Sequence, residues 1–307
     1  MHITPNESEA RCYETLCALI GDRERAWSFM LRYCVDGKSP IPSYSEELER
    51  EFGLSGDAVD SLWHAVREAF DKERISYSVI KEGDELFPEN LGEEKIHYIY
   101  AAGNIELLRD KRVTVIGMTH PSLQGKSDVM DFVKEAVSKD IAILAPLDTG
   151  LGAFALSAAL KENGKAIAMV SGQLSKCPSE GLLELQGEIY SKGLLLSIFA
   201  PSVKVEKWHV VFRNRYLSGI SKAVFLAEEK DGGPSWAIFD PAMDRGCPVM
   251  LSSSISDSPS FIWARERARR GALVMKRPGD LRKLIPQERK RERKAALDLT
   301  PSLFDDI

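Results

Sequence analysis

The sequence has few cysteines and none of the spacings that make cysteine a crosslink or a metal ligand. Five cysteines are scattered over 307 residues, and no two of them form a Cys-x-x-Cys pair. An odd and scattered set argues against a disulfide framework or a zinc site, so we expect reduced, mostly buried thiols and a cytoplasmic location. The five histidines show no ligand spacing either, and we expect no bound metal.

Long apolar runs are also missing. The longest are strand-sized, such as residues 194–197, whereas a membrane helix needs about 20 apolar residues. The first residues show no basic segment followed by an apolar one, so we expect no signal peptide. Hydrophobic residues make up 44% and charged residues 28%, which is typical of a folded chain. These numbers predict a folded protein with no membrane partner.

The common nucleotide-binding motifs are absent as well. A dinucleotide fingerprint needs three glycines after the first strand of the fold, but Gly117 is followed by Met-Thr-His-Pro-Ser. The chain contains no G-x-x-x-x-G-K-S/T, H-E-x-x-H or G-x-S-x-G motif. We therefore expect no cofactor.

What the sequence does contain is a regular alternation of helical and strand patterns. Residues 8–35 and 43–73 have helical spacing, with Gly53 and Gly56 interrupting the second stretch. Strands are expected at 75–80, 113–117, 141–145, 166–170, 194–197, 223–227 and 248–251, and helices at 126–139, 150–163, 179–192, 208–219 and 234–245. This alternation predicts an α/β fold with an extended, Rossmann-like, doubly wound and mostly parallel sheet.

The same patterns suggest three parts. We expect a small helical module at residues 1–75, the Rossmann-like core at 76–276, and a basic, partly helical or flexible tail at 277–307. The tail stands out by charge, because residues 265–294 contain 13 basic and 4 acidic residues, a net +9 in a chain of net −5. Such a segment is typical either of a solvated helix and tail or of contact with nucleic-acid phosphates.

Ligands of parallel sheets bind beyond the carboxyl ends of the strands, so the loops there are the candidate site. Gly117 and Lys126 flank the start of an expected helix, whose amino terminus would attract an anion. The loop after the strand at 166–170 offers Ser171, Gly172 and Lys176. We expect both loops to contact phosphate.

A second candidate lies in the helix expected at residues 208–219. There Arg213, Asn214 and Arg215 stand between apolar residues. Arginine presents a planar fork to phosphate, and asparagine can donate to and accept from a base or backbone. On a helix the three side chains point in different directions, so either arginine could instead brace the fold through an acidic neighbour.

These residues carry a family resemblance. A Gly-Leu-Leu-Leu-Ser strand at 193–197, then Phe-Arg-Asn-Arg at 212–215 and Ser-Gly-Ile-Ser at 218–221, resembles the DprA/Smf (DNA-processing protein A) pattern. Residues 87–91, 226–228 and 244–249 resemble further family segments in the same order. The resemblance implies an extended Rossmann core, a homodimer, and single-stranded DNA binding in a basic pocket.

The sequence also departs from the family pattern. Gly117-Met118-Thr119 stands where the family has Gly-Ser-Arg, and residues 145–152 replace a Ser-Gly-x-Ala-Arg-Gly-Ile-Asp loop. Each replacement lacks the family's arginine. The family's Gly-x-Gly-Leu-Asp-x-x-Tyr-Pro loop corresponds to residues 171–178, and no winged-helix segment is evident at the carboxyl end.

Three functions follow as hypotheses. The first is a non-enzymatic DNA-binding protein for DNA processing, uptake or recombination, with single-stranded DNA and a recombinase as partners. The second is an antitoxin-like or regulatory component of a phage-defence toxin–antitoxin pair. The third is a nucleotide-processing enzyme using Asp148, Glu228 and Glu229, although the two glutamates could equally brace Arg213 or Arg215.

Two expectations concern protein partners. The homodimer that the resemblance implies would use the apolar, strand-sized edges and the helix face formed by Phe239, Ala242 and Met243. Near the end of the chain, Ser302-Leu303-Phe304 resembles the peptides that dock on the bacterial sliding clamp, without their usual leading glutamine. A leucine and an aromatic ring buried together would give a weak, recruiting interaction.

Overall fold

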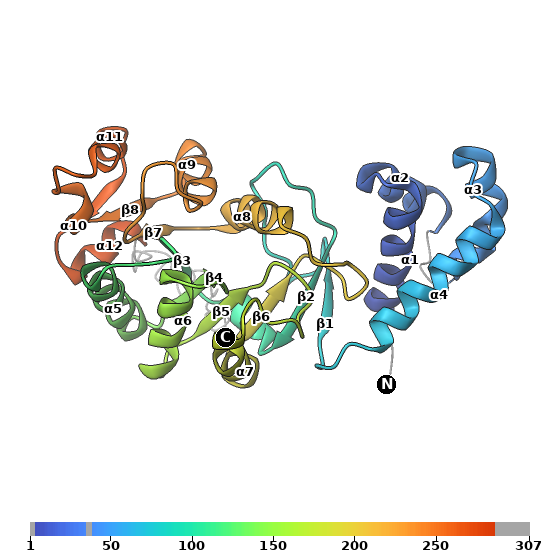
Figure 1. The fold of residues 1–307 in the computed structure, drawn as a ribbon, viewed down its shortest axis with the longest axis horizontal. Helices are drawn as coiled ribbons and strands as arrows, with labels where there is room; N and C mark the ends of the chain where they lie inside the picture. The colour runs from blue at the N-terminus through green and yellow to red at the C-terminus, as the bar shows by residue number, and fades with distance from the viewer. Residues whose placement is uncertain (1–3, 35–38, 286–307) are drawn as a thin grey trace, which may run out of the picture.

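A nine-stranded, mostly parallel sheet forms the centre of the computed structural model, which describes residues 4–34 and 39–285 (Figure 1). Its strand order is β1-β2-β6-β5-β4-β3-β7-β8-β9. The strands are β1 (Ser78–Lys81), β2 (Tyr98–Gly103), β3 (Arg112–Ile116), β4 (Ala142–Pro146), β5 (Ala166–Met169), β6 (Leu194–Ser197), β7 (Val224–Leu226), β8 (Val249–Ser252) and β9 (Leu273–Met275). Only β2 runs antiparallel to its neighbours β1 and β6, so the predicted doubly wound α/β class is confirmed.

Helices cover both faces of this sheet. On one face lie α5 (Leu123–Ser138), α6 (Leu151–Lys161) and α7 (Leu183–Lys192), drawn below the sheet in Figure 1. On the other lie α8 (Trp208–Ile220), α9 (Trp236–Asp244), α10 (Ser253–Ser256) and α11 (Ile262–Arg269). The side chains of successive strand residues point to opposite faces of the sheet. Ile143 belongs to the core under α5 and α6, and Leu144 belongs to the core under α8 and α9. Both layers are apolar, which is why the strands read as continuous apolar runs.

The amino-terminal module contains α1 (Pro5–Ile20), α2 (Arg23–Tyr33), α3 (Ser45–Phe52) and α4 (Gly56–Asp71). The stretch expected to be helical at 8–35 is thus two helices. Gly21 ends α1 in the left-handed region at φ 73°, and Asp22 starts α2 by accepting a hydrogen bond from the Arg25 amide. A glycine and a capping aspartate in succession make this sharp break favourable.

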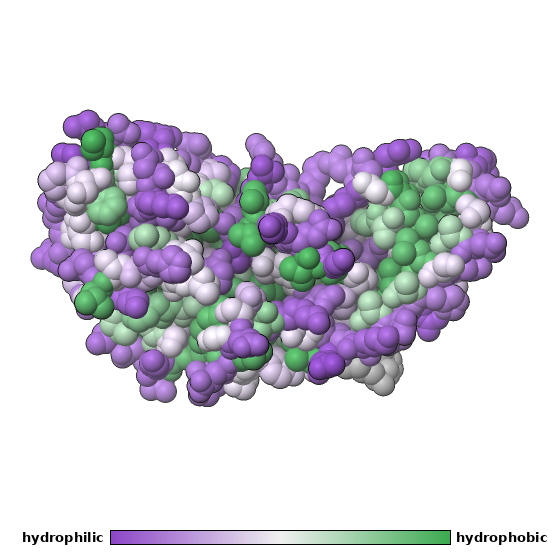
Figure 2. Space-filling model, in the orientation of Figure 1, coloured by the Kyte–Doolittle hydropathy of each residue, from purple (hydrophilic) through white to green (hydrophobic). Residues whose placement is uncertain are grey.

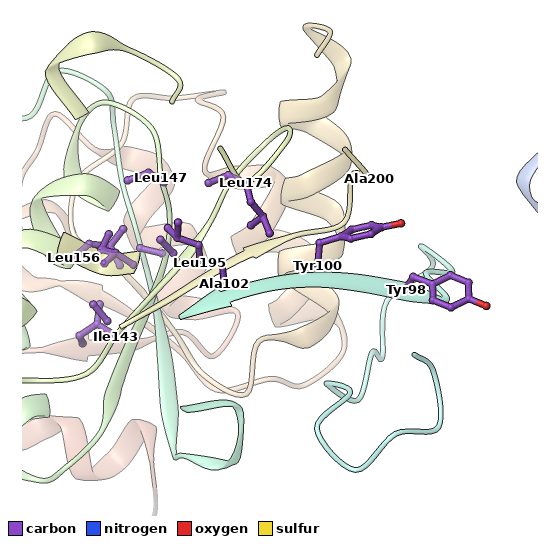
Figure 3. Packing of buried hydrophobic residues seen from close by; sticks show 14 of the residues in the cluster. Tyr98, Tyr100, Ala102, Ile143, Leu147, Leu156, Leu174, Leu195 and Ala200 are labelled. Carbon is purple, nitrogen blue, oxygen red and sulfur yellow. The ribbon is translucent and has the colours of Figure 1, made fainter. Parts of the chain in front are cut away.

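The module packs directly on the antiparallel edge of the sheet. Tyr98 and Tyr100 point from β2 away from the parallel strands (Figure 3), toward α1, where their hydroxyls donate to Glu9 and Glu14. The Trp27 ring of α2 stacks on His97 at a centroid distance of 3.8 Å. The core of α1, α2 and α4 is therefore continuous with one face of the sheet.

Several elements were absent from the sequence expectations. Strand β2 was not predicted, although its Tyr-Ile-Tyr-Ala-Ala run has strand character. Residues 262–285 fold as α11, β9 and α12 (Leu281–Leu284), and the Leu281 side chain is fully buried against the sheet's α5 side. The core therefore continues past the boundary expected at 276, and the rest of the expected tail, residues 286–307 with the Ser302-Leu303-Phe304 motif, lies outside the described residues.

The prediction that a face of α9 forms the dimer contact is wrong in part. Phe239 and Ala242 are buried within the protein's own core, at 1% and 0% exposure. Their side chains pack under α9 against the sheet, so they are not available to a second copy. Across the described residues, no helix is long and apolar enough to cross a membrane, and all five cysteines are free thiols.

The first prediction tests the layer between α5 and the sheet. The rings of Phe132 on α5 and Phe225 on β7 stack at 3.9 Å, and both are fully buried. We expect Phe132→Ala to lower the free energy of unfolding by about 3–5 kcal/mol, because the cavity cannot collapse between two rigid elements. The control Leu31→Ala, at a side chain 60% exposed, should change it by less than about 0.5 kcal/mol in urea denaturation. Equal losses in the two variants would contradict this layer.

Candidate nucleic-acid interface

The place where Rossmann-type folds usually hold a phosphate is occupied by a side chain of the protein itself. Strand order reverses between β3 and β7, which makes the loops after these strands the crevice of the sheet. There the Glu228 carboxylate accepts hydrogen bonds from the Ser122 amide at 2.9 Å and from the Ser122 hydroxyl at 3.0 Å. Gly125 lets this carboxylate approach, since a Cβ there would collide with Glu228. The amino terminus of α5 is thereby already neutralised.

A second carboxylate, that of Glu229, accepts hydrogen bonds at the amino terminus of α9. Glu229 is fully buried and accepts from the amides of Lys230 at 3.0 Å and Ser235 at 3.1 Å. Neither Glu228 nor Glu229 contacts an arginine of α8, so the expectation that they brace Arg213 or Arg215 is wrong. Both glutamates therefore have a structural role at the start of a helix.

The contacts of Glu228 make the loop at Gly117 less suitable for binding an anion. Gly117 and Lys126 lie on either side of the α5 amino terminus, as expected, and Lys126 is exposed. Glu228 already accepts from the Ser122 amide, and the Gly125 amide donates to the Ser122 hydroxyl, so two amides at this helix start have partners within the chain. An incoming phosphate would have to displace a carboxylate of the same chain, so this loop is a poorer anion site than its sequence indicates.

Arg213 is buried and links α8 to the loops at the end of the sheet. Its side chain is 1% exposed, and it donates to Asp148 at 2.8 Å, to the Met169 carbonyl at 3.4 Å and to the Asn214 side chain at 3.0 Å. Asp148 follows β4 and Met169 ends β5, so this guanidinium ties α8 to two loops at the carboxyl edge of the sheet. Of the two roles foreseen for Arg213, the structure supports bracing.

The three neighbouring residues of the Arg-Asn-Arg run do not share one site. Asn214 is 5% exposed and uses its side-chain oxygen on Arg213. Arg215 points the other way, with a side chain 63% exposed, and pairs with Glu94 at 3.4 Å. It lines a separate pocket that also contains Glu93 and Asp244. The lining holds three carboxylates against two arginines, the second of which is Arg245, so it offers a phosphate no excess of positive charge.

The most promising surface for a nucleic acid lies at the carboxyl ends of β5 and β6. We call it the edge pocket; its volume is about 430 Å³ and it is lined by Ser171, Gly172, Gln173, Lys176, Cys177, Pro178, Lys204 and Val205. Ser171, Gly172 and Lys176 were expected there from the sequence. Lys204 was not, because it lies in the irregular segment between β6 and α8, where no periodic pattern singles it out.

The walls of the edge pocket are tied together by hydrogen bonds. Ser197, fully buried, donates to the Gly172 carbonyl at 2.6 Å and accepts from the Phe199 amide at 2.9 Å. The Gln173 side chain donates to the Pro201 carbonyl at 2.6 Å. The loop after β5 is therefore bound to the segment after β6, which pre-organises the pocket.

His209 also fixes this region. It is 1% exposed, stacks on Phe199 at 4.0 Å, and its Nδ1 accepts from the Glu206 amide at 3.3 Å. Burial lowers its pKa, an effect opposed by the nearby Glu206 charge and by a hydrogen bond to the Ser171 backbone. The neutral ring thus links both walls of the edge pocket.

The charges at the edge pocket are available for a ligand. Lys176, Lys204 and the neighbouring Lys207 are exposed, and none of them forms an ion pair with a described residue. By contrast, much of the charge at 265–285 is compensated, since Arg267 pairs with Asp240 at 2.9 Å and Arg270 with Asp244 at 2.7 Å. Within the described residues, no group of three or more metal-ligating side chains comes together.

Comparison with known proteins gives a consistent result. The family model for DNA recombination-mediator protein A matches residues 78–285, more than half of the chain. DNA processing protein DprA of Streptococcus pneumoniae is 30% identical over 188 residues, which is 60% of this chain and 65% of that protein. DprA of Bacillus subtilis is 28% identical over 152 residues, 49% of this chain and 51% of that protein. The chain thus matches between half and two thirds of the length of these relatives.

Two solved structures share the fold. An X-ray structure of DprA from Streptococcus pneumoniae aligns with a TM-score of 0.70 at 20% identity, covering 94% of this chain and 100% of that one. A structure of DNA processing protein A from Helicobacter pylori, described for its single-stranded DNA binding mode, aligns with a TM-score of 0.58 at 18% identity. It covers 68% of this chain and 95% of that chain.

The second prediction concerns the brace. Asp148→Asn should lower the free energy of unfolding by about 3 kcal/mol, because it leaves the buried Arg213 guanidinium without a counter-charge. Arg213→Met should cost less, about 1–2 kcal/mol, since the Asp148 side chain is 42% exposed and can be rehydrated. Urea denaturation checks the order, with Arg215→Met as the matched control at less than about 0.5 kcal/mol. A larger loss for Arg213→Met than for Asp148→Asn would contradict this reasoning.

The third prediction concerns pH. The folded state lowers the pKa of His209, so the unfolded chain binds a proton there more readily. Stability contributed by the neutral ring is therefore complete above the unfolded pKa of about 6.5 and falls as the pH drops toward the lowered folded pKa. His209→Phe keeps the stack on Phe199 and should show a shallower loss of unfolding free energy between pH 7.5 and 5. Parallel curves for the two proteins would refute the effect.

Proposed function

The chain belongs to the DNA recombination-mediator protein A family, and on that premise we propose that it binds single-stranded DNA along the carboxyl edge of β5 and β6. The edge pocket is the observation that supports this site. It combines two unpaired lysines with small and polar loop residues in a pre-organised depression. Phosphates need cations and close approach to the backbone, and this surface offers both.

The roles of individual residues follow from their positions. Lys176 and Lys204 would contact phosphates from opposite walls, and Ser171 and Gly172 would let the backbone come close. In Gly172 a Cβ would collide with Val205, so this position needs glycine to keep the two walls together. Arg213 and Asn214 would hold the loops in place from beneath, and Arg215 and Lys126 would contribute at most through long-range charge. Gly117 would not contact the strand; it lets Leu151 pack closely at the end of β3.

We infer a binding role and not a catalytic one. Asp148 neutralises a buried arginine, while Glu228 and Glu229 cap helices, so the three acids considered for nucleotide chemistry all have structural partners. A DNA-binding protein of this family would present its strand to other proteins of DNA processing or recombination. A homodimer is part of the same proposal, through a surface other than Phe239 and Ala242.

The fourth prediction tests the edge pocket. Binding of a fluorescein-labelled 20-nucleotide single strand, followed by anisotropy, should weaken steeply with salt because counterions are released. Lys176→Ala/Lys204→Ala should lower the affinity and reduce the magnitude of the slope of log K against log salt by roughly 1.4. Each phosphate contact on a single strand contributes about 0.7 to that slope.

Lys161→Ala provides the control. Lys161 is exposed at the carboxyl end of α6, on the opposite edge of the sheet, and its removal should leave the slope unchanged. Lys126→Ala, at the crevice filled by Glu228, should have a smaller effect than either edge-pocket lysine. An absence of binding at low salt, or equal effects of all four lysines, would reject the proposed site.

A further inference from the structure

A second pocket lies where the helical module meets the core. This junction pocket has a volume of about 360 Å³, and its walls include Leu62 and Val66 of α4 and Val203 and Trp208 of the segment entering α8. Apolar surface gathers on the helical module in Figure 2, on the right, beside the hollow that separates the module from the core. The pocket is therefore an apolar slot between two rigidly joined parts.

The polar groups of the junction pocket have unused hydrogen-bonding capacity. Glu14 is 4% exposed, and its Oε1 receives only the Tyr100 hydroxyl at 3.4 Å and a distant Arg23 guanidinium at 3.9 Å. Its Oε2 has no hydrogen-bond donor among the described residues. The buried Nε of Arg23 also lacks a partner there. Burial raises the pKa of Glu14, because these contacts compensate its desolvation incompletely.

Trp208 provides a rigid aromatic wall. Its side chain is 52% exposed although it is large and apolar, and its Nε1 donates to Glu206 at 2.7 Å. The rings of Phe199 and Phe212 contact it edge-to-face at 6.2 and 5.8 Å. The ring is thus fixed in orientation while half of its surface stays open, which is typical of a stacking platform.

The junction pocket adjoins the edge pocket. The segment from Pro201 to Trp208 separates them, because Lys204 and Val205 line the edge pocket while Ser202, Val203 and Trp208 line the junction pocket. The segment carries two exposed lysines, Lys204 in the wall of the edge pocket and Lys207 directly before Trp208 in the sequence. A strand whose phosphates follow these lysines would bring a base to Trp208.

We propose that the junction pocket receives one base of the bound single strand, stacked on Trp208, with an amino group of the base donating to Glu14. The inference rests on the proposed DNA binding and adds base selection to it. A planar ring fits an apolar slot with one aromatic wall, and the carboxylate selects the edge that the ring presents. Adenine, cytosine and guanine carry an exocyclic amino group that can donate to the carboxylate, whereas thymine has none and offers only its ring N3–H, flanked by two carbonyl oxygens that a carboxylate repels.

The experiment compares two homopolymers at pH 7.5 by fluorescence anisotropy. Labelled 20-nucleotide oligo(dC) should bind the full chain several-fold more tightly than oligo(dT) of the same length, and the difference should persist at higher salt. Glu14→Gln should remove most of this preference while leaving oligo(dT) binding within about two-fold, since the neutral amide is a weaker acceptor for the amino group of cytosine and thymine has no such group to lose. Trp208→Ala should weaken both oligonucleotides about ten-fold, through the loss of stacking.

Controls separate the possible failures. Ile262→Ala removes another exposed apolar side chain, 63% exposed on α11 at the far end of the sheet, and should leave both affinities unchanged. Melting temperatures of all variants check that the module stays folded on the core. Equal affinity for oligo(dC) and oligo(dT), or unchanged binding by Trp208→Ala, overturns the base pocket and leaves the slot to a different occupant such as a peptide. Failure of the full chain to bind either strand at low salt overturns the proposed function itself.

Discussion

Glu228 places a negative charge of the protein itself at the switch point of the sheet, and this contact decides where a ligand can bind. In a doubly wound fold, the first helix amino terminus attracts anions through unpaired amides and its dipole. Here the carboxylate takes the Ser122 amide and hydroxyl, and Glu229 does the same for the start of α9. At the α5 end of the crevice an anion would compete with the Glu228 carboxylate, which is why we place the proposed DNA site further along the same edge, at β5 and β6.

The edge pocket at β5 and β6 is held in shape by buried polar residues beneath its loops. A buried guanidinium is costly unless its nitrogens find acceptors, and each of the three side-chain nitrogens of Arg213 does so, on Asp148, the Met169 carbonyl and Asn214. These partners come from two strand ends and from α8 itself. Ser197 and Gln173 complete the connection between the loops after β5 and β6. The rigidity of the edge pocket is thus a consequence of polar groups that contact no ligand.

The helical module extends this edge. Because Tyr98 and Tyr100 of the antiparallel strand β2 bond to α1, the module is attached to the sheet through buried contacts and not through a loose linker. Its position brings Glu14 of the module and Trp208 of the core into the lining of one pocket. In the proposed binding mode, phosphate contacts in the edge pocket would supply affinity, and base contacts in the junction pocket would supply selectivity.

The sequence by itself determined the α/β class, most of the parallel strands and helices, and the family, because apolar periodicity and the Phe-Arg-Asn-Arg and Gly-Leu-Leu-Leu-Ser segments are local signals. It also indicated Ser171, Gly172 and Lys176, which line the edge pocket. It did not reveal β2, although the Tyr-Ile-Tyr-Ala-Ala run has strand character, and it missed β9 and α11, because short elements among charged residues near the sheet edge carry weak patterns.

Only the tertiary structure decided what the charged residues do. Arg213 and Arg215 are two positions apart, yet one is buried under the sheet edge and the other is exposed beside Glu94. Glu228 and Glu229 cap different helices although they are adjacent in the sequence. Lys176 and Lys204 line the same pocket from two loops, which are joined by the hydrogen bond between Ser197 and Gly172, 25 residues apart in the chain. A pairing between distant segments depends on how strands and helices pack, and no local pattern of residues contains that information.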